Sequence, residues 1–366
     1  MEWIELGKLA NIETGKLNAN AADEDGKYPF FTCADEISRI NDYKYDKECI
    51  LIAGNGNLNV KYYSGKFNAY QRTYIIESKD KKTLSTMYLY YFMNTYMDKL
   101  RELSIGGVIK YIKLGHLQDA KIPVPPMEIQ EKIVKVLDQA QALIDKRKEQ
   151  IKALDQLIES IFYTMFGDPV RNEKGWELKK LGELGTLGRG ISKHRPRDDK
   201  ILYGNEYPFI QTGDVARSGL YLTNYSNMYS KMGLEQSKLW EKGTLCITIA
   251  ANIAKTSILG IDACFPDSIV GFIANENSNV IYVKTWFEFL QKIIEQKAPQ
   301  SAQKNINLKI LNELEIITPS NSLQNEFAQK VEVIEKQKEV LGESLELLEE
   351  NYKSIMDKAF KGQLFN

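Results

Sequence analysis

The sequence has 366 residues, of which 43% are hydrophobic and 27% charged, so it is long enough to build more than one packed core. No run of 18 apolar residues occurs, which argues against a membrane-spanning helix and a membrane partner. The net charge of −1 excludes nucleic-acid binding through bulk positive charge, so any such binding must use local basic clusters.

The number and spacing of cysteines and histidines limit what metal the chain could bind. The four cysteines, Cys33, Cys49, Cys246 and Cys264, lack the CxxC spacing of metal sites, and there are only two histidines. Both observations argue against a zinc site. Widely spaced cysteines of this kind are typical of reduced thiols, so we expect a cytoplasmic protein with no bound metal.

Residues 1–125 form the first predicted domain, of the α+β class. The β-rich run CILIAG at 49–54 predicts a buried strand. The tyrosine pair at 62–63, followed by a glycine turn and the run TYIIES at 73–78, predicts a hairpin. The amphipathic run at 87–104 predicts a helix.

Residues 126–167 form the second segment, a long predicted helix. Its apolar residues follow alternating steps of four and three, which is the 3.5-residue period of a coiled coil. They are Ile133, Leu137, Ala140, Ile144, Ile151, Leu154, Ile158, Ile161 and Met165. Only Arg147 interrupts this row, and a single helix of this kind would expose its apolar stripe.

Residues 168–319 form the second predicted domain, again α+β. The run TLCITIA at 244–250 resembles the buried strand of the first domain. Further strands are predicted at 270–277 (VGFIANEN) and at 279–286 (NVIYVKTW). The run WFEFLQKIIEQK at 286–297 predicts an amphipathic helix.

Residues 320–366 form the fourth segment, a second long predicted helix. Its apolar row is Phe327, Val331, Ile334, Leu341, Leu345, Leu348, Tyr352, Ile355 and Ala359. Lys338 interrupts this row as Arg147 interrupts the first, and we expect both charged groups to reach solvent. The segment is acidic, with 6 Lys and Arg against 9 Asp and Glu.

The two halves of the chain are copies of each other. Adding 194 to every position of the first apolar row gives the second row. The same offset relates residues before and at the start of the helices, which are Ile112, Leu114, Leu117, Ile122, Pro125 and Gln130 in the first half. An offset of 175 relates Leu6, Gly7, Leu9, Ile12 and Gly15 to Leu181, Gly182, Leu184, Leu187 and Gly190. We therefore predict two related domains and two helices that bury each other's apolar stripes.

These segments together resemble a known family. KGWELKKLGELGTLGRGISKHRPRD at 174–198, IPVPPMEIQEKI at 122–133 and the helix ending in FYTMFG at 162–167 are similar to the specificity subunit of a type I restriction-modification system. The resemblance covers the whole chain. It departs from the pattern at the start of the second helix, where ITPSNSLQ lacks the Pro-Pro pair of the first.

The resemblance implies both a fold and a function. It implies two target-recognition domains, each reading one half of a bipartite site in double-stranded DNA, and two antiparallel helices that hold the domains apart. It also implies two modification subunits, which transfer methyl groups from S-adenosylmethionine to adenine N6, and restriction subunits that hydrolyse ATP and cut DNA. S-adenosylmethionine, ATP and Mg are then expected on the partner subunits, and no cofactor on this chain.

The sharpest basic cluster lies early in the second domain. Arginine can chelate guanine in the major groove, and lysine and serine suit phosphates. The candidate DNA-binding residues here are Arg189, Ser192, Lys193, His194, Arg195 and Arg197, followed by Asn252, Lys255 and Lys304. A solvated basic loop is the alternative interpretation of the cluster. A simple hairpin turn is the alternative at Asn252 and Lys255, and a helix-capping loop is the alternative at Lys304.

The first domain offers matching loops with fewer charges. Asparagine and glutamine can read adenine, and lysine can bind phosphate. The candidates are Lys16, Asn18, Asn20, Asn55, Asn57, Gln71, Arg72 and Lys110. Ordinary turns, which favour Asn-Gly pairs, remain an alternative for the asparagines. The alternatives are an ion-paired surface strand for Gln71 and Arg72 and a helix-capping loop for Lys110.

Catalytic motifs are weak. Pro266-Asp267 and Glu295-Gln296-Lys297 superficially fit the PD…ExK pattern of metal-dependent nucleases, but the first half has no counterpart. No GxGxxG follows a predicted strand, and no GxxxxGK[ST] occurs. We expect a non-catalytic subunit that reads DNA. The alternative is a duplicated coiled-coil scaffold that binds proteins and not DNA.

Overall fold

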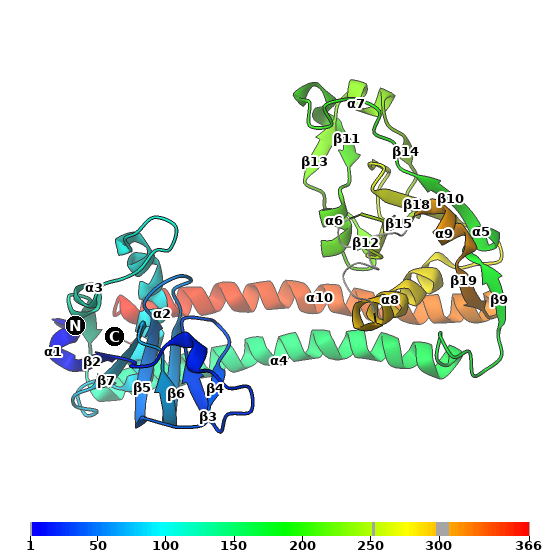
Figure 1. The fold of residues 1–366 in the computed structure, drawn as a ribbon. Helices are drawn as coiled ribbons and strands as arrows, with labels where there is room; N and C mark the ends of the chain where they lie inside the picture. The colour runs from blue at the N-terminus through cyan, green and yellow to red at the C-terminus, as the bar shows by residue number, and fades with distance from the viewer. Residues whose placement is uncertain (1, 251–252, 298–306, 366) are drawn as a thin grey trace. The chain divides into compact units, whose positions relative to one another are not determined.

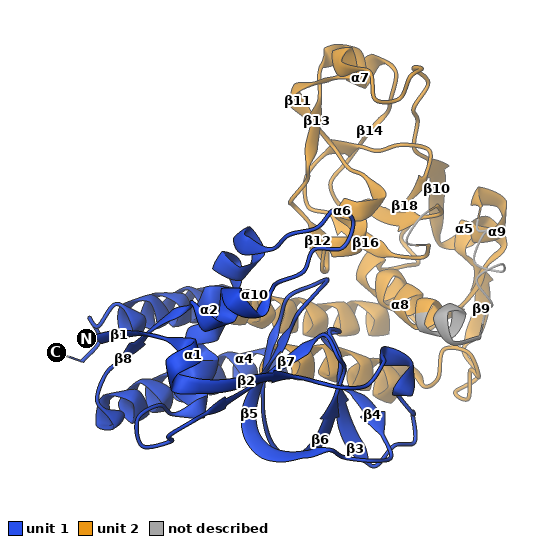
Figure 2. Cartoon of the chain, turned by 60° about the vertical axis from the view of Figure 1, so that its left-hand side comes forward, with its two compact units in different colours: residues 1–149, 343–366 blue, residues 150–342 orange. Residues whose placement is uncertain are grey.

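The computed structural model describes residues 2–250, 253–297 and 307–365 (Figure 1). The chain forms two compact units (Figure 2): residues 1–149 with 343–366, and residues 150–342. Both unit boundaries fall inside long helices, so each unit contains one half of each helix. Among the described residues, no helix combines the length and apolarity needed to cross a membrane.

The first unit is built on a six-stranded sheet with the strand order β2-β7-β5-β6-β3-β4. Helix α2 packs on β5 and β6 of this sheet. The elements are β1 (Glu2–Glu5), α1 (Leu6–Leu9), β2 (Ala10–Thr14), η1 (Ala19–Ala21), β3 (Tyr28–Phe31), β4 (Ser38–Ile40), β5 (Tyr45–Ala53), β6 (Val60–Ala69), β7 (Thr73–Ser78), α2 (Thr86–Leu103), α3 (Leu114–Gln118), β8 (Lys121–Val124) and α4 (Met127–Phe166).

The second unit has a five-stranded sheet, β10-β18-β15-β16-β12, and a four-stranded sheet, β13-β11-β17-β14. Its elements are β9 (Glu177–Lys180), α5 (Leu181–Leu184), β10 (Gly185–Arg189), η2 (Lys200–Leu202), β11 (Tyr203–Phe209), α6 (Thr212–Arg217), β12 (Tyr221–Leu222), β13 (Asn227–Tyr229), α7 (Lys231–Glu235), β14 (Leu239–Trp240), β15 (Leu245–Thr248), β16 (Thr256–Leu259), β17 (Ala263–Cys264), β18 (Ile269–Ala274), α8 (Val280–Lys297), α9 (Leu308–Glu313), β19 (Glu315–Thr318) and α10 (Asn321–Phe360).

The duplication predicted from the sequence is present in the fold. The strand order β2-β7-β5-β6 of the first unit recurs as β10-β18-β15-β16 in the second. Helices α2 and α8, strands β8 and β19, and helices α4 and α10 begin and end at positions that differ by 194. In the second unit, β16 and β17 together take the place of the long strand β6, since β3 pairs in parallel with the end of β6 and β11 with β17.

A buried glutamine explains part of the repeated sequence. Gln130 has no exposed surface, and its amide donates to the backbone carbonyls of Thr83 (2.8 Å) and Pro125 (2.9 Å) while accepting from the Ser85 N–H (2.9 Å). Gln324, 194 residues later, binds the backbone of its own unit in the same way. Each amide satisfies backbone groups that would otherwise be buried without a partner.

Two local predictions are wrong. The segments at 62–63 and 73–78 do not form a hairpin, because β6 pairs antiparallel with β5, and β7 pairs with the other edge of β5. The run at 279–286 is not a strand but the start of helix α8. Its β-branched residues favour a strand locally, but packing within the second unit overrides that preference. The 194-residue offset from α2 correctly indicates the helix.

The two long helices pack antiparallel. In the first unit, Ile133 near the start of α4 lies in the same hydrophobic core as Phe360 at the end of α10. In the second unit, Phe166 at the end of α4 shares a core with Phe327 near the start of α10. A pairing of the start of one helix with the end of the other, found in both units, defines an antiparallel pair.

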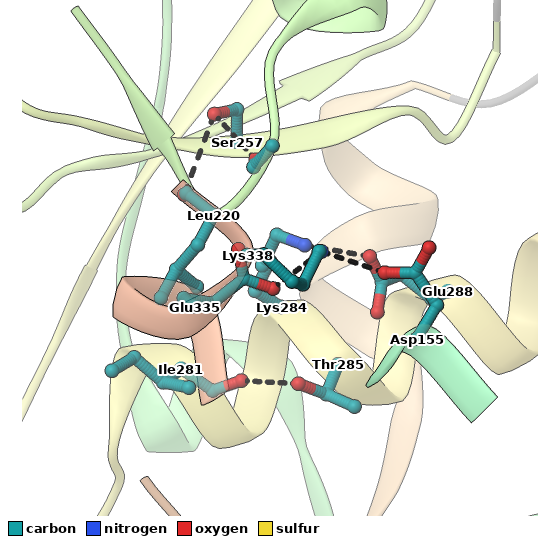
Figure 3. A network of polar contacts seen from close by, with 10 residues as sticks. Asp155, Leu220, Ser257, Ile281, Lys284, Thr285, Glu288, Glu335 and Lys338 are labelled. Atoms are coloured by element: carbon teal, nitrogen blue, oxygen red, sulfur yellow. Dashed lines mark hydrogen bonds and ion pairs between the residues drawn. The ribbon is translucent and has the colours of Figure 1, made fainter. Parts of the chain in front are cut away.

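The expectation that Lys338 reaches solvent freely is wrong. Its ammonium group forms ion pairs with Asp155 of α4 (2.6 Å) and Glu335 of its own helix (2.8 Å), and its side chain is only 19% exposed (Figure 3). Burial alone would lower the pKa of Lys338, but the hydrogen bonds to both carboxylates outweigh that effect and raise the pKa above its ordinary value. The interruption in the apolar row therefore carries an ion pair between the two helices.

Substitution of Lys338 by leucine is expected to destabilise the second unit by about 1–3 kcal/mol, because the partly buried Glu335 and the more exposed Asp155 lose their cation. Chemical denaturation measures the loss. Since the folded-state pKa of Lys338 is raised, this contribution is complete at neutral pH and is lost as the pH rises through that pKa. Lys336→Leu, at an exposed position of the same helix, is the control. Equal stability of the two variants would contradict the prediction.

Candidate nucleic-acid interface

Four of the candidate segments in the first domain meet at one corner of the six-stranded sheet, where β2 and β5 end and β7 begins. Backbone hydrogen bonds of 2.8–3.0 Å join them: Gly15 N–H to Thr73, Gln71 N–H to Leu17, Gly54 N–H to Arg72 and Gly56 N–H to Lys110. These segments are as much as 95 positions apart in sequence, between Gly15 and Lys110. We call this place, formed by residues 15–20, 54–57, 70–72 and 110–112, the first corner.

The first corner presents polar side chains to solvent. Lys16, Arg72 and Lys110 are exposed and form no ion pair with any residue that the structure describes. Gln71 and Arg72 line an open pocket of about 330 Å³, together with Thr14, Gly54, Tyr74 and Ile112. Asn18 and Asn20 are exposed, and Asn55 is half-buried, on the loops around it. The surface therefore presents cations, and most of its amides, without a side-chain partner in the described part of the chain.

Asn57 differs from the other amides of the first corner. Its side-chain amide donates to the Asp35 carboxylate at 3.1 Å. It therefore already has a protein partner, which Asn18, Asn20, Asn55 and Gln71 lack within the described part of the chain.

Close backbone contact explains the glycine that begins the corresponding loop in each domain. A Cβ atom on Gly15 would lie 2.2 Å from the Ala69 carbonyl oxygen, and one on Gly190 would lie 2.2 Å from that of Pro266. No larger residue fits at either position without moving the backbone. The repeated glycine thus fixes where each candidate loop leaves its sheet.

The basic loop of the second domain is tied down by its own protein. Arg197 forms an ion pair with the Asp267 carboxylate (2.7 Å), and the Arg189 guanidinium donates to the Asp267 backbone carbonyl. Arg195 folds back to donate to the carbonyls of Ser192 (2.8 Å) and His194 (2.7 Å). The loop is exposed, but its three arginines all have protein partners.

The other candidates of the second domain vary in their surroundings. Lys193 is exposed and forms no ion pair with the described residues, while Ser192 is buried and His194 lies 2.9 Å from the Asp199 carboxylate. Hydrogen bonding to His194 lowers the pKa of Asp199. Lys255 instead lines a cavity of about 390 Å³ with acidic residues of α4, α8 and α10. Asn252 and Lys304 lie outside the described residues.

At the place in the second domain that corresponds to the first corner, one acidic side chain, Asp267, binds the basic loop, which the sequence did not predict. Gln71 and Arg72 directly precede β7, and Asp267 and Ser268 directly precede the equivalent strand β18. An exposed amide in the first unit is thus replaced by a carboxylate in the second, and this carboxylate holds Arg197. The correspondence between Gln71 and Asp267 appears when β7 is aligned with β18, and not when the 194-residue offset is applied.

The nuclease-like motif is not assembled in the described residues. The carboxylate of Asp267 is occupied by Arg197, and the side chains of Glu295 and Lys297 lie outside the described part. Within that part, no three His, Cys, Asp or Glu side chains are grouped so as to hold a metal ion. All four cysteines are free thiols, and burial raises the pKa of Cys49 to about 12.

Comparison with known proteins gives a consistent family. The model of the family described as type I restriction modification DNA specificity domain matches residues 1–155 and 173–350. The chain is 40% identical over 161 residues to the type I restriction enzyme EcoDI specificity subunit of Escherichia coli. This alignment covers 43% of the chain and 36% of that relative. It is 25% identical over 293 residues to a putative type I restriction enzyme specificity subunit of Haemophilus influenzae, covering 77% of the chain and 74% of that protein.

Solved structures share the fold. The type I restriction-modification S subunit from M. genitalium superimposes with a TM-score of 0.62 at 16% identity, covering 98% of this chain and 96% of that one. A chain from a study of complex assembly and conformational transition in the type I R-M system gives a TM-score of 0.58, covering 99% and 98%. The family match extends over both repeated domains and most of both helices, and the chain therefore belongs to the type I restriction-modification DNA specificity subunits.

Proposed function

We propose that each unit of this chain reads one half of a bipartite target in double-stranded DNA. The first corner carries the proposal, because it gathers, from four segments on one exposed surface, three cations and several amides that have no side-chain partner among the residues the structure describes. Cations supply the sequence-independent affinity for phosphates, and amides and guanidinium groups supply the contacts to base edges. A protein-binding scaffold would not require such a combination.

The geometry suggests a division of roles within the first corner. Gln71 and Arg72 line the pocket, where a base edge could be enclosed, so we assign them to base contacts with adenine and guanine respectively. Lys16 and Lys110 are exposed on the flanking loops and are assigned to phosphates. Asn18, Asn20 and Asn55 supply further contacts around the pocket.

The second unit is proposed to bind DNA after a local exchange of partners. Arg197 must leave Asp267 before it can chelate a guanine, and that ion pair is half-exposed, with side chains 51% and 28% exposed. Exposed ion pairs of this kind are worth about 0–1 kcal/mol, so the exchange costs little. Lys193, which needs no such exchange, is assigned to a phosphate.

We further propose that α4 and α10 set the spacing of the two half-sites and dock two modification subunits. Restriction subunits would complete the assembly. The chemistry then belongs to the partners: S-adenosylmethionine for methylation, and ATP and Mg for translocation and cleavage. The support is the family itself and the continuity of both helices from one unit into the other.

Arg72→Ala and Arg197→Ala are expected to relax the target in different halves, each with a loss of about 1–3 kcal/mol on the intact target. Lys110→Ala is expected to weaken binding on every sequence and to reduce the slope of log K against log salt by about one. The measurement is binding of the full chain, with any modification subunits that co-purify, to duplexes mutated in one half-site at a time across a salt series.

Lys82→Ala is the matched control, because Lys82 is an exposed lysine of the same unit beyond the opposite end of β7. It should leave affinity, salt slope and half-site preference unchanged. If wild-type protein binds unrelated duplexes equally well at all salt concentrations, or binds none, the reading function is wrong and the coiled-coil scaffold becomes the better account.

A further inference from the structure

The loop between α2 and α3 has a rigid neck. Ile105 and Tyr111 pair as an antiparallel bridge, with hydrogen bonds of 3.0 and 2.9 Å in the two directions. The Lys110 carbonyl also accepts the N–H of Gly56 at 2.9 Å, which ties the loop to the first corner. Gly106 turns the chain at a φ of +118°, and a Cβ there would lie 2.6 Å from the Ile109 carbonyl. The neck therefore holds the tip, residues 107–110, in a defined place.

The tip presents two adjacent apolar side chains to water. Val108 is as exposed as in a free peptide, at 104%, and Ile109 is 63% exposed. Single exposed apolar residues are ordinary on protein surfaces. Two neighbouring β-branched residues at the end of a tethered loop are different, because a glycine at positive φ and three backbone hydrogen bonds hold them out from the surface.

The charge around the tip indicates its partner. The segment 104–112 has no acidic residue, and Lys110 directly follows the apolar pair. The loop joins the first corner, where Lys16 and Arg72 are exposed and unpaired in the described part of the chain. An apolar tip that is followed by a lysine and joined to a corner with two more cations fits a polyanion with a hydrophobic interior, which describes the stacked bases of a DNA duplex.

We propose that Val108 and Ile109 form a wedge that enters a base step of the duplex when the first unit binds its half-site. This inference rests on the proposed DNA-reading function and adds to it a mode of recognition by deformation. Apolar side chains inserted between base pairs unstack them and bend the helix, so sequences that unstack easily are preferred at that step. The wedge would give specificity without a hydrogen bond to a base.

The wedge belongs to the first repeat only. At the offset of 194 residues, Ala302 and Gln303 stand in place of Val108 and Ile109, whereas Lys304 retains the lysine of position 110. The second repeat thus keeps the cation and lacks the apolar pair in its sequence. Distortion of the DNA is therefore expected in the half-site of the first unit and not in the other.

The test is permanganate footprinting, since permanganate oxidises thymines that are unstacked. The full chain, with any modification subunits that co-purify, is first used to select its target from random duplexes. Thymines are then placed in turn at each position of both half-sites. We expect one step in a single half-site to become at least fivefold more reactive when wild-type protein binds. The double variant Val108→Ser, Ile109→Ser should abolish that reactivity and weaken binding about 5- to 50-fold, with an unchanged salt slope, because no charge is removed.

Two control variants separate the wedge from general effects. The variant Val108→Leu, Ile109→Leu keeps apolar bulk and should retain the reactive thymine. Val170→Ser removes an exposed β-branched side chain from the turn that follows α4, in the second unit, and should change nothing in the footprint. Unfolding curves of all variants should coincide with that of the wild type, since every substituted side chain is mostly exposed.

Other outcomes overturn the wedge without touching the proposed function. Sequence-selective binding by wild-type protein with no reactive thymine would show that the tip does not enter the duplex. A serine variant with the wild-type footprint and affinity that no longer co-purifies with modification subunits would make the tip a protein contact. Failure of wild-type protein to select any sequence would instead reject the reading function itself.

Discussion

Seven residues inserted into α4 alone, between Glu149 and Gln150, are expected to disrupt helix pairing in one unit, whereas matched insertions in both helices should leave both units folded. The second insertion lies between Gly342 and Glu343. Both positions are boundaries between the compact units, so neither insertion alters the residues packed within a unit. One heptad lengthens a helix by about 10 Å, and α10 cannot follow unless it is lengthened too.

The size of the effect follows from the antiparallel packing. Each unit contains one half of each helix, so a single insertion forces either a looped-out heptad or loss of packing in one core. The matched pair restores equal lengths and returns the apolar rows to nearly the same face, with a drift of about 20°. Thermal unfolding followed by circular dichroism should show a clearly lower Tm for the single insertion and little change in Tm for the paired insertion.

The paired insertion also tests the helices as a spacer. We expect it to change the unread spacer, by up to about three base pairs for 10 Å at about 3.4 Å per base pair, while both half-sites keep their sequences. Selection from random duplexes with the wild-type and paired-insertion proteins measures both quantities. Altered half-site sequences with an unchanged spacer would show that the helices do not set the spacing.

The repeat accounts for most of what the sequence predicted correctly. A helix places residues three and four apart on one face, so a heptad pattern of apolar residues depends only on local geometry. The amino-acid pattern alone therefore locates α4 and α10. The structure extends the 194-residue offset to hydrogen bonds, since Tyr88 and Tyr282 donate to the carbonyls of Pro123 and Ile317 respectively. A strict offset thus predicts contacts as well as elements.

Long-range pairing accounts for most of what the sequence could not predict. The first corner joins segments whose proximity depends on the order of strands in a sheet, and no local pattern encodes that order. The mistaken hairpin at 62–78 shows the same limit, since β7 passes β6 to pair with the far edge of β5. Asp155 as the partner of Lys338 depended on the pairing of two helices that are distant in sequence.

The basic loop of the second unit shows that a cluster of charges in the sequence need not be available in the folded protein. A cluster of Arg189, Arg195 and Arg197 reads as available charge, but each guanidinium donates to a carbonyl or to Asp267 in the folded chain. The first unit has fewer basic residues at its corner and leaves Lys16, Arg72 and Lys110 without ion pairs in the described residues. The structure therefore shows which basic side chains are available to a ligand, whereas the sequence gives only their number.

Phe162→Ala is expected to destabilise the second unit by about 3–5 kcal/mol, because it removes a large, fully buried ring. The Phe162 ring of α4 contacts Phe289 of α8 with centroids 4.6 Å apart, and Phe327 of α10 at 5.6 Å. It therefore joins both long helices to the recognition domain of this unit. The cavity left by alanine would weaken all three contacts together.

Hydrogen exchange resolved by segment measures whether this loss stays in one unit. The first unit has its own core, which includes Ile133, Leu137 and Phe360, so its amides should keep their protection while those of α8 and β15–β18 lose theirs. Leu157→Ala, at a position of α4 that is 44% exposed, should change neither unit by more than about 0.5 kcal/mol. Equal loss of protection in both units would show that they unfold as one body, and the half-sites could then no longer be treated as independently read.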